Sequence, residues 1–254
     1  MRLSEFYAKE IILKTKEIFG DKARVYLFGS RVDDAKKGGD IDLYIKPENN
    51  EDLYKKKIKF LVALEQMLGE QKIDVIIATD PSRYIEQVAM KNGIELNMID
   101  LKIQQVLKEC DRHLLRINDA YQDMQAFMLL NQEKYQQLTK DEIQAIDQYL
   151  YRFGKMQDAM GGKLFKLIIA KYEVNAERLA FIDILNKLEK LQIISSAEEW
   201  KILRKISNDL AHEYEEDPLE MASMLNSIYS KKPILENIYM KIKAFLEQVS
   251  EKHA

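Results

Sequence analysis

Residues 38–45 read GGDIDLYI, a segment in which hydrophobic and polar side chains alternate. This spacing predicts a strand with Ile41, Leu43 and Ile45 on one face and Asp40, Asp42 and Tyr44 on the other. An ionised carboxylate is costly to remove from water unless a partner compensates for its charge. The polar face therefore either lies in solvent or holds a cation between its carboxylates, and the segment alone leaves both interpretations open.

Composition limits the classes of protein to which the chain can belong. Its 254 residues are enough for two ordinary domains, and 46% hydrophobic with 32% charged residues is a globular balance. The formal charge of −3 argues against bulk electrostatic capture of nucleic acid, although a local basic patch is compatible with it. A single cysteine, Cys110, and three histidines disfavour disulfides and zinc cages. Without a signal peptide or an apolar run of about 20 residues, we expect a cytoplasmic protein without membrane contact.

Two different kinds of pattern divide the chain near residue 103. Before it, strand-like runs ARVYLF, GGDIDLYI and KIDVIIA are interspersed with helical patterns over residues 3–19, 51–68 and 81–93. After it, the strand signals stop, and helices are predicted over residues 101–135, 141–171, 178–192, 197–214 and 218–250. We therefore expect an α+β domain over residues 1–103 and an up-and-down helical bundle over residues 104–254.

The first part carries oxygen ligands in a pattern typical of phosphate chemistry. Asp40 and Asp42 lie two residues apart, so both carboxylates project from one face of a strand, and Asp74 lies on another strand. Carboxylate oxygens suit Mg²⁺, which proteins often bind together with substrate phosphates. Gly29 would let the backbone approach a phosphate, and Ser30 offers a hydroxyl and an N–H.

The order FGSR, GGDIDLYI and KIDVII resembles the minimal nucleotidyltransferases of the DNA polymerase β-like superfamily over about the first 100 residues. The resemblance implies a mixed sheet with helices, two Mg²⁺ ions and ATP or another nucleoside triphosphate as donor. It implies that Gly29 and Ser30 hold phosphates, that Arg31 steadies the triphosphate, and that Asp40 and Asp42 bind metal. Asp74 would bind metal and activate the acceptor hydroxyl. A nucleotide-binding pseudoenzyme is the alternative for this part.

The segment SNDLAHEY, residues 207–214, resembles the Arg-Asn, three residues, His-x-Tyr signature of HEPN domains, and residues 149–168 resemble a HEPN helix. The matching positions are Asn208, His212 and Tyr214. Ser207 stands where active HEPN ribonucleases have their arginine, and a serine supplies no fixed cation. The resemblance implies a fused counterpart of nucleotidyltransferase–HEPN toxin–antitoxin modules. In those modules the tyrosine of His-x-Tyr accepts AMP, and HEPN relatives dimerise.

These features predict a Mg²⁺-dependent transferase that moves a nucleoside monophosphate, AMP in the leading case, onto a hydroxyl such as a protein tyrosine. Two alternatives remain: a HEPN-type RNA-binding protein or ribonuclease, and an aminoglycoside-type small-molecule nucleotidyltransferase. Two further features of the second part are ambiguous. Arg152, Lys155, Lys163 and Lys166 fit either a phosphate-facing groove or a solvated helix face. Gly161 and Gly162 fit either a helix kink or a close helix contact.

Overall fold

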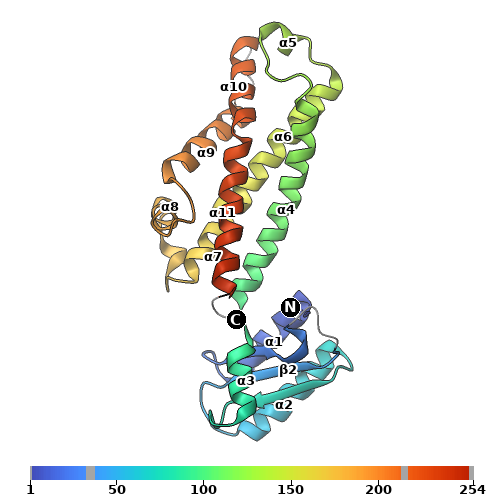
Figure 1. Ribbon diagram of the computed structural model, residues 1–254, viewed down its shortest axis with the longest axis vertical. Helices are drawn as coiled ribbons and strands as arrows, with labels where there is room; N and C mark the ends of the chain where they lie inside the picture. The colour runs from blue at the N-terminus through green and yellow to red at the C-terminus, as the bar shows by residue number, and fades with distance from the viewer. Residues whose placement is uncertain (1, 33–37, 213–216, 252–254) are drawn as a thin grey trace. The chain divides into compact units, whose positions relative to one another are not determined.

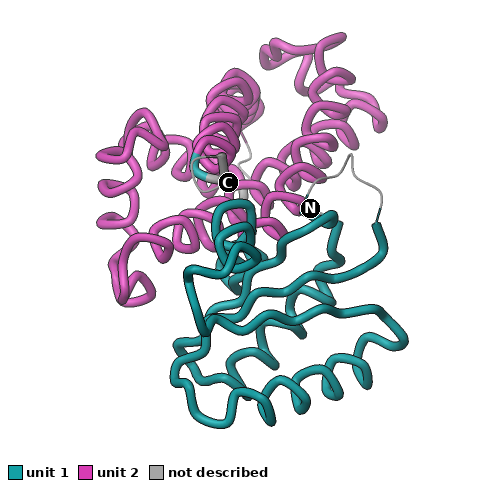
Figure 2. The backbone as a smooth tube through the Cα atoms, turned by 60° about the horizontal axis from the view of Figure 1, so that its bottom comes forward, with its two compact units in different colours: residues 1–102, 249–254 teal, residues 103–248 magenta. Residues whose placement is uncertain are grey.

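The computed structural model describes residues 2–32, 38–212 and 217–251. The chain forms two compact units, residues 1–102 with 249–254 and residues 103–248 (Figure 2). Helix α4, Met98–Met124, runs through the division between them. No helix among the described residues combines the length and the apolar character that a membrane crossing requires.

Three helices of the first unit begin and end where local chemistry predicts. Helix α1, Glu5–Phe19, starts after Ser4, whose side chain accepts a hydrogen bond from the Tyr7 N–H, and it ends at Gly20 with φ of 106°. Helix α2, Leu53–Leu68, ends at Gly69, and helix α3, Tyr84–Asn92, ends at Gly93. The helices expected over residues 3–19, 51–68 and 81–93 are therefore confirmed.

Four strands form a mixed sheet in the order β3-β2-β1-β4. Strands β1, Arg24–Phe28, and β2, Ile41–Lys46, are antiparallel, whereas β2 and β3, Ile73–Ile77, are parallel and are connected through α2. Strand β4, Ile94–Leu96, adds an antiparallel edge next to β1. The expected α+β fold with a mixed sheet is confirmed. The sequence did not separate β4 from the helix before it, because three residues are too few to show a period.

Both faces of the sheet are covered. Ile41, Leu43 and Ile45 are fully buried in a cluster with Phe19 of α1 and Phe60 of α2. On the opposite face, Tyr44 packs with Tyr26, Phe28 and Ala89 of α3. The expected alternation along β2 is confirmed, and its polar face is covered by α3 from Tyr44 onward. Asp40 and Asp42, which precede Tyr44 on that face, lie where β2 begins.

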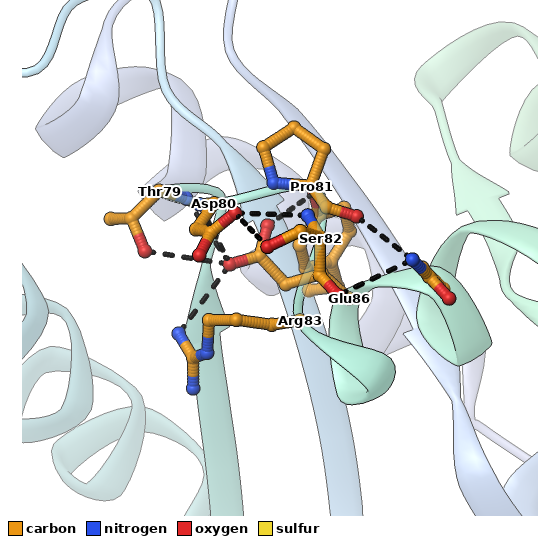
Figure 3. A network of polar contacts seen from close by, with 8 residues as sticks. Thr79, Asp80, Pro81, Ser82, Arg83 and Glu86 are labelled. Carbon is orange, nitrogen blue, oxygen red and sulfur yellow. Dashed lines mark hydrogen bonds and ion pairs between the residues drawn. The ribbon is translucent and has the colours of Figure 1, made fainter.

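A buried carboxylate joins α3 to the loop that follows β3 (Figure 3). The side chain of Glu86 is 1% exposed, and Tyr44 donates its hydroxyl to Glu86 Oε2 at 3.1 Å. Glu86 Oε1 accepts from the backbone N–H groups of Thr79 and Asp80 at 3.3 and 3.2 Å, and lies 3.4 Å from Arg83 Nη1. Burial, and then the bond to Glu86, raise the pKa of Tyr44 to about 12. This network fixes the covering helix on the sheet face that carries the aspartates.

The second unit is helical, and α4, α6 and α11 run along its length (Figure 1). After α4 the chain forms α5, Gln132–Gln136, and α6, Lys140–Gln157, which leads through a π-helical segment, Asp158–Leu164, into α7, Phe165–Ala170. Helices α8, Phe181–Lys190, α9, Ala197–His212, α10, Pro218–Ser230, and α11, Lys232–Glu251, follow. Thr139 and Glu142 form a capping box at the start of α6.

Two of the predicted helices are wrong in extent. The helix expected over residues 101–135 stops at Met124, and farther along the chain the Asn226 side chain accepts from the N–H of Leu130 and donates to its carbonyl. The helix expected over residues 218–250 is broken after Ser230, and α11 restarts with Pro233 in its first turn, where a missing N–H is tolerated.

The two adjacent glycines lie inside the π-helical segment, and one of them allows a close contact. A Cβ atom on Gly161 would lie 2.9 Å from Cζ2 of Trp200, the largest of the fully buried side chains. The Trp200 ring packs on Phe165 with 4.6 Å between ring centroids. Of the two alternatives left open for these glycines, a kink or a close helix contact, the structure shows a close contact at Gly161, because the indole occupies the space that a larger side chain would need.

Replacing Glu86 tests whether its network holds α3 in place. Glu86→Ala leaves the Tyr44 hydroxyl buried without its acceptor, and it removes the acceptor of two part-buried backbone N–H groups. We expect a loss of about 3 kcal/mol in the free energy of unfolding, and about 1 kcal/mol for Tyr44→Phe. Urea unfolding measures both. Glu95→Ala, an exposed carboxylate on β4, is the control, and an equal loss in the two alanine variants would contradict the role of the network.

Candidate functional site

The sheet register brings three aspartates to one place. Asp42 and Asp74 are direct partners in the parallel pairing of β2 and β3, and therefore project from the same face of adjacent strands. Asp40 precedes Asp42 by two residues and so shares its face. Phe28, the last residue of β1, pairs with Asp42, which places the turn after β1 at the same end of the sheet.

The three carboxylates are close enough to affect one another. Burial raises the pKa of Asp42, and the negative charges of Asp74 and Asp40 raise it further. The positive charges of Lys72 and Arg31 act in the opposite direction. A cation among these oxygens would favour the ionised form of Asp42, because an opposite charge within a few ångströms stabilises a carboxylate.

A lysine that the sequence reasoning did not single out supplies a positive charge at this position. The Lys72 ammonium forms an ion pair with Asp40 and lies 3.9 Å from Oδ2 of Asp74. The hydrogen bond to Asp40 is the main cause of the raised pKa of Lys72, followed by the charges of Asp40 and Asp74. The lysine side chain is 69% exposed. A detectable signal existed in KIDVII, where Lys72 and Asp74 are two residues apart on the same face.

The Gly-Ser turn lies directly against Asp42. Residues Gly29–Arg31 form a single helical turn after β1, and Gly29 has φ of 75°. A Cβ atom on Gly29 would lie 2.1 Å from Asp42 Oδ2, and one on Gly38 would lie 2.2 Å from the Ser30 hydroxyl oxygen. Gly29 is therefore required both by its backbone angle and by the Asp42 carboxylate, which occupies the space that a Cβ atom would need.

Two arginines fasten this turn to the segment before β2. Arg31 donates from Nε to the Asp40 carbonyl at 3.1 Å, from Nη2 to the Gly39 carbonyl, and from Nη1 to the Arg2 carbonyl at 3.2 Å. Arg2 donates to the carbonyl of Ser30 at 2.9 Å, and its N–H donates to the Arg31 carbonyl. The guanidinium of Arg31 thus holds the turn in shape. Its expected contact with a triphosphate stays a prediction, and no sequence signal marked Arg2.

The donor chemistry of the site fits a divalent cation, whereas its side-chain arrangement holds an ammonium. Among the described residues, no group of three or more His, Cys, Asp or Glu side chains is placed to hold a metal ion. Asp40 is instead turned toward Lys72. The Asp40 and Asp74 side chains are 42% and 61% exposed, so they can reorient, and all three aspartates supply the oxygen ligands that Mg²⁺ prefers.

The HEPN-like motif is only partly described. Asn208 is exposed on α9, His212 is the last residue of that helix with its side chain undescribed, and Tyr214 lies outside the described residues. Ser207 faces α6, because a Cβ on Gly154 would lie 3.7 Å from its hydroxyl oxygen. Arg204, the nearest arginine in the sequence to the missing one, forms an ion pair with Asp158 at 2.7 Å.

Residues 10–102 match the family model described as Polymerase beta, Nucleotidyltransferase. The matched segment is less than half of the chain and includes Gly29, Ser30 and the three aspartates. It supports a nucleotidyltransferase domain in the first unit, and with it a transferase that uses a nucleoside triphosphate. Neither the curated proteins nor the solved structures returned a match.

The contact between Gly29 and Asp42 can be tested with a matched glycine. Gly69 has the same φ of 75° as Gly29, but nothing lies within 4 Å of a Cβ placed on it. Gly69→Ala should therefore lose about 1 kcal/mol of unfolding free energy from backbone strain alone. Gly29→Ala should lose clearly more, because it also displaces the Asp42 carboxylate. Urea unfolding compares the two, and equal losses would contradict the contact.

Replacing Lys72 tests whether its ammonium competes with metal for the carboxylates. Lys72→Met should bind Mn²⁺ about two- to fivefold more tightly than the unmodified chain, since exposed ion pairs contribute up to about 1 kcal/mol. The unbound Mn²⁺ signal in electron paramagnetic resonance measures this affinity. Lys55→Met, which removes an exposed lysine paired with Asp52, is the control. Unchanged or weaker Mn²⁺ binding by Lys72→Met would show that Lys72 does not compete.

Proposed function

We propose that the chain transfers a nucleoside monophosphate from a nucleoside triphosphate to a hydroxyl group, with pyrophosphate as the leaving group. The observation that carries this proposal is the register pairing of Asp42 with Asp74 beside Asp40 and the Gly29–Ser30 turn. The family match over the same residues supports it. We propose that the transferred nucleoside monophosphate is AMP and that ATP is its donor.

Each residue of the site has a proposed task. Asp40, Asp42 and Asp74 hold Mg²⁺, as two ions in the full proposal, and the metal when bound offsets the charge on the phosphates. Gly29 and Ser30 receive the β- and γ-phosphates, and Arg31 and Arg2 hold their turn in place. Lys72 leaves Asp40 when metal binds, and its ammonium is then free to pair with a phosphate oxygen.

The proposed reaction is an in-line displacement at the α-phosphorus. The acceptor oxygen forms a bond to that phosphorus while the bond to the bridging oxygen of pyrophosphate breaks. Asp74 accepts the proton that the acceptor hydroxyl loses. Its carboxylate is more than half exposed, so a hydroxyl can reach it without displacing the core of the sheet.

We further propose a protein tyrosine as the acceptor, in a toxin–antitoxin-like setting. The support is the likeness of the second unit to HEPN domains, in which Asn208, His212 and Tyr214 match the motif. Tyr214 is the candidate acceptor within this chain or in a second copy of a homodimer. Ribonuclease activity is disfavoured, because Ser207 supplies no cation and Arg204 is paired with Asp158.

Pyrophosphate release tests the transfer. The chain is incubated with Mg²⁺ and each common nucleoside triphosphate, alone and with a cell lysate separated by size. We expect pyrophosphate release, fastest with ATP, and a mass increase of one nucleoside monophosphate on the acceptor. Asp42→Asn should reduce the rate by at least about 100-fold, because it removes a charged metal ligand.

Asp21→Asn, which changes an exposed carboxylate in the turn before β1, is the control and should keep the native rate. Pyrophosphate release that needs the large-molecule fraction of the lysate indicates a protein acceptor. Release without lysate, accompanied by the mass increase on the chain itself, indicates that the chain is its own acceptor. Release that depends on the small-molecule fraction indicates a soluble alcohol and would contradict the tyrosine proposal. Release by Asp42→Asn at the native rate would contradict the proposed site.

A further inference from the structure

A basic groove lies within the second unit, between helices α4 and α6. It encloses about 450 Å³ and is lined by Glu109, Arg112, His113, Leu115, Arg116 and Arg152. Five of these residues come from α4, and Arg152 comes from α6. Of the basic residues that the sequence singled out on α6, Arg152 is the one that lines the groove, and the arginines of α4 were not anticipated.

The positive charges in this groove are only partly neutralised by the protein. Glu109 is paired with Lys163 at 2.9 Å, and Arg116 lies 3.5 Å from Asp119 on its own helix. Within the described ranges, Arg112 and Arg152 have no ion-pair partner. Like charges that converge without partners repel one another, so an anion placed between them is stabilised.

The surroundings of the histidine in the groove disfavour its protonation. Burial lowers the pKa of His113, and the charges of Arg152, Arg112 and Lys155 lower it further, against the opposing charge of Glu109. The Nδ1 atom of His113 is buried and has no hydrogen-bond partner within the structure. His113 thus contributes an unpaired ring nitrogen to the lining of the groove, next to Arg112 and Arg152.

An exposed aromatic ring adjoins the groove through Arg152. The Arg152 guanidinium lies 5.3 Å from the ring centroid of Tyr151, and Lys155 Nζ lies 5.7 Å from it. Tyr151 is 57% exposed, and Leu115 in the groove is 60% exposed. Flat or apolar surfaces beside cations are the arrangement on which unpaired bases stack.

We propose that this groove binds single-stranded nucleic acid, with Arg112, Arg116 and Arg152 on the phosphates and Tyr151 against a base. Exposed guanidinium groups bind a lone phosphate weakly in water, whereas several such contacts add up along a polyanion as counterions are released. This favours a strand over a small nucleotide. Leu115 and Tyr151 favour unpaired bases over a duplex, whose bases are already stacked.

Binding is tested on the full chain with a labelled oligouridylate of about 12 nucleotides, within the range of site sizes for such proteins. EDTA is present and nucleoside triphosphates are absent, so the readout does not depend on the proposed transfer or its metal. Fluorescence anisotropy follows binding between about 50 and 200 mM salt. An equivalent DNA strand shows whether the 2′-hydroxyl contributes.

We expect binding that weakens with salt, and a loss of affinity of about tenfold or more in Arg112→Ala/Arg152→Ala. The slope of log affinity against log salt should fall by about 0.7 for each phosphate contact removed. Arg178→Ala/Lys190→Ala removes the same charge from exposed positions of the second unit outside the groove, and should bind as the unmodified chain does. Thermal unfolding confirms that each variant folds.

Three results would overturn the proposal. One is no binding of either strand at the lowest salt concentration. Another is an equal loss of affinity in the groove variant and the surface control. The last is groove-dependent binding of ATP, lost in Arg112→Ala/Arg152→Ala, without binding of a strand. That last result would assign the groove to a small nucleotide instead.

Discussion

Like charges are held close together where β1 ends and β2 and β3 begin, and the surrounding structure keeps them there. The pairing of β2 with β3 places Asp42 beside Asp74, and the missing side chain of Gly29 leaves the space that the Asp42 carboxylate occupies. Burial raises the pKa of Asp42, and the neighbouring charges of Asp74 and Asp40 raise it further. Lys72 supplies part of the missing positive charge. The site is thus suited to a cation, and an exposed ammonium holds that position in the structure.

Much of the packing in the first unit positions the residues at this one end of the sheet. The α1 and α2 helices bury the apolar face of β2, which fixes the register that brings the aspartates together. On the opposite face, the Glu86 network secures α3 beyond Tyr44, so that the covered part of the face ends before the aspartates begin. Hydrogen bonds from Arg2 and Arg31 hold the Gly29–Arg31 turn against the segment that precedes β2. A rigid sheet and a fastened turn around exposed carboxylates is an arrangement suited to binding a charged substrate.

The sequence predicted those parts of the molecule that depend on local periodicity and turn chemistry. The alternation in GGDIDLYI indicated both faces of β2, and Gly20 and Gly69 marked the ends of α1 and α2. Long-range contacts were not visible in it. The Lys72 ammonium reaches Asp40 across the pairing of β2 with β3, and the Asn226 side chain binds the backbone of Leu130, 96 residues earlier in the chain. The arginine groove between α4 and α6 likewise exists only once the two helices pack.

The most direct test of the cation site is a crystal structure of the chain with Mn²⁺ and a non-hydrolysable ATP analogue. Anomalous scattering from Mn²⁺ identifies the metal positions without reference to activity. We expect an anomalous peak between the carboxylates of Asp40, Asp42 and Asp74, with Lys72 moved away from Asp40 and the analogue's phosphates beside Gly29 and Ser30. A nucleotide bound elsewhere, or Lys72 still paired with Asp40 and no metal among the three aspartates, would contradict it.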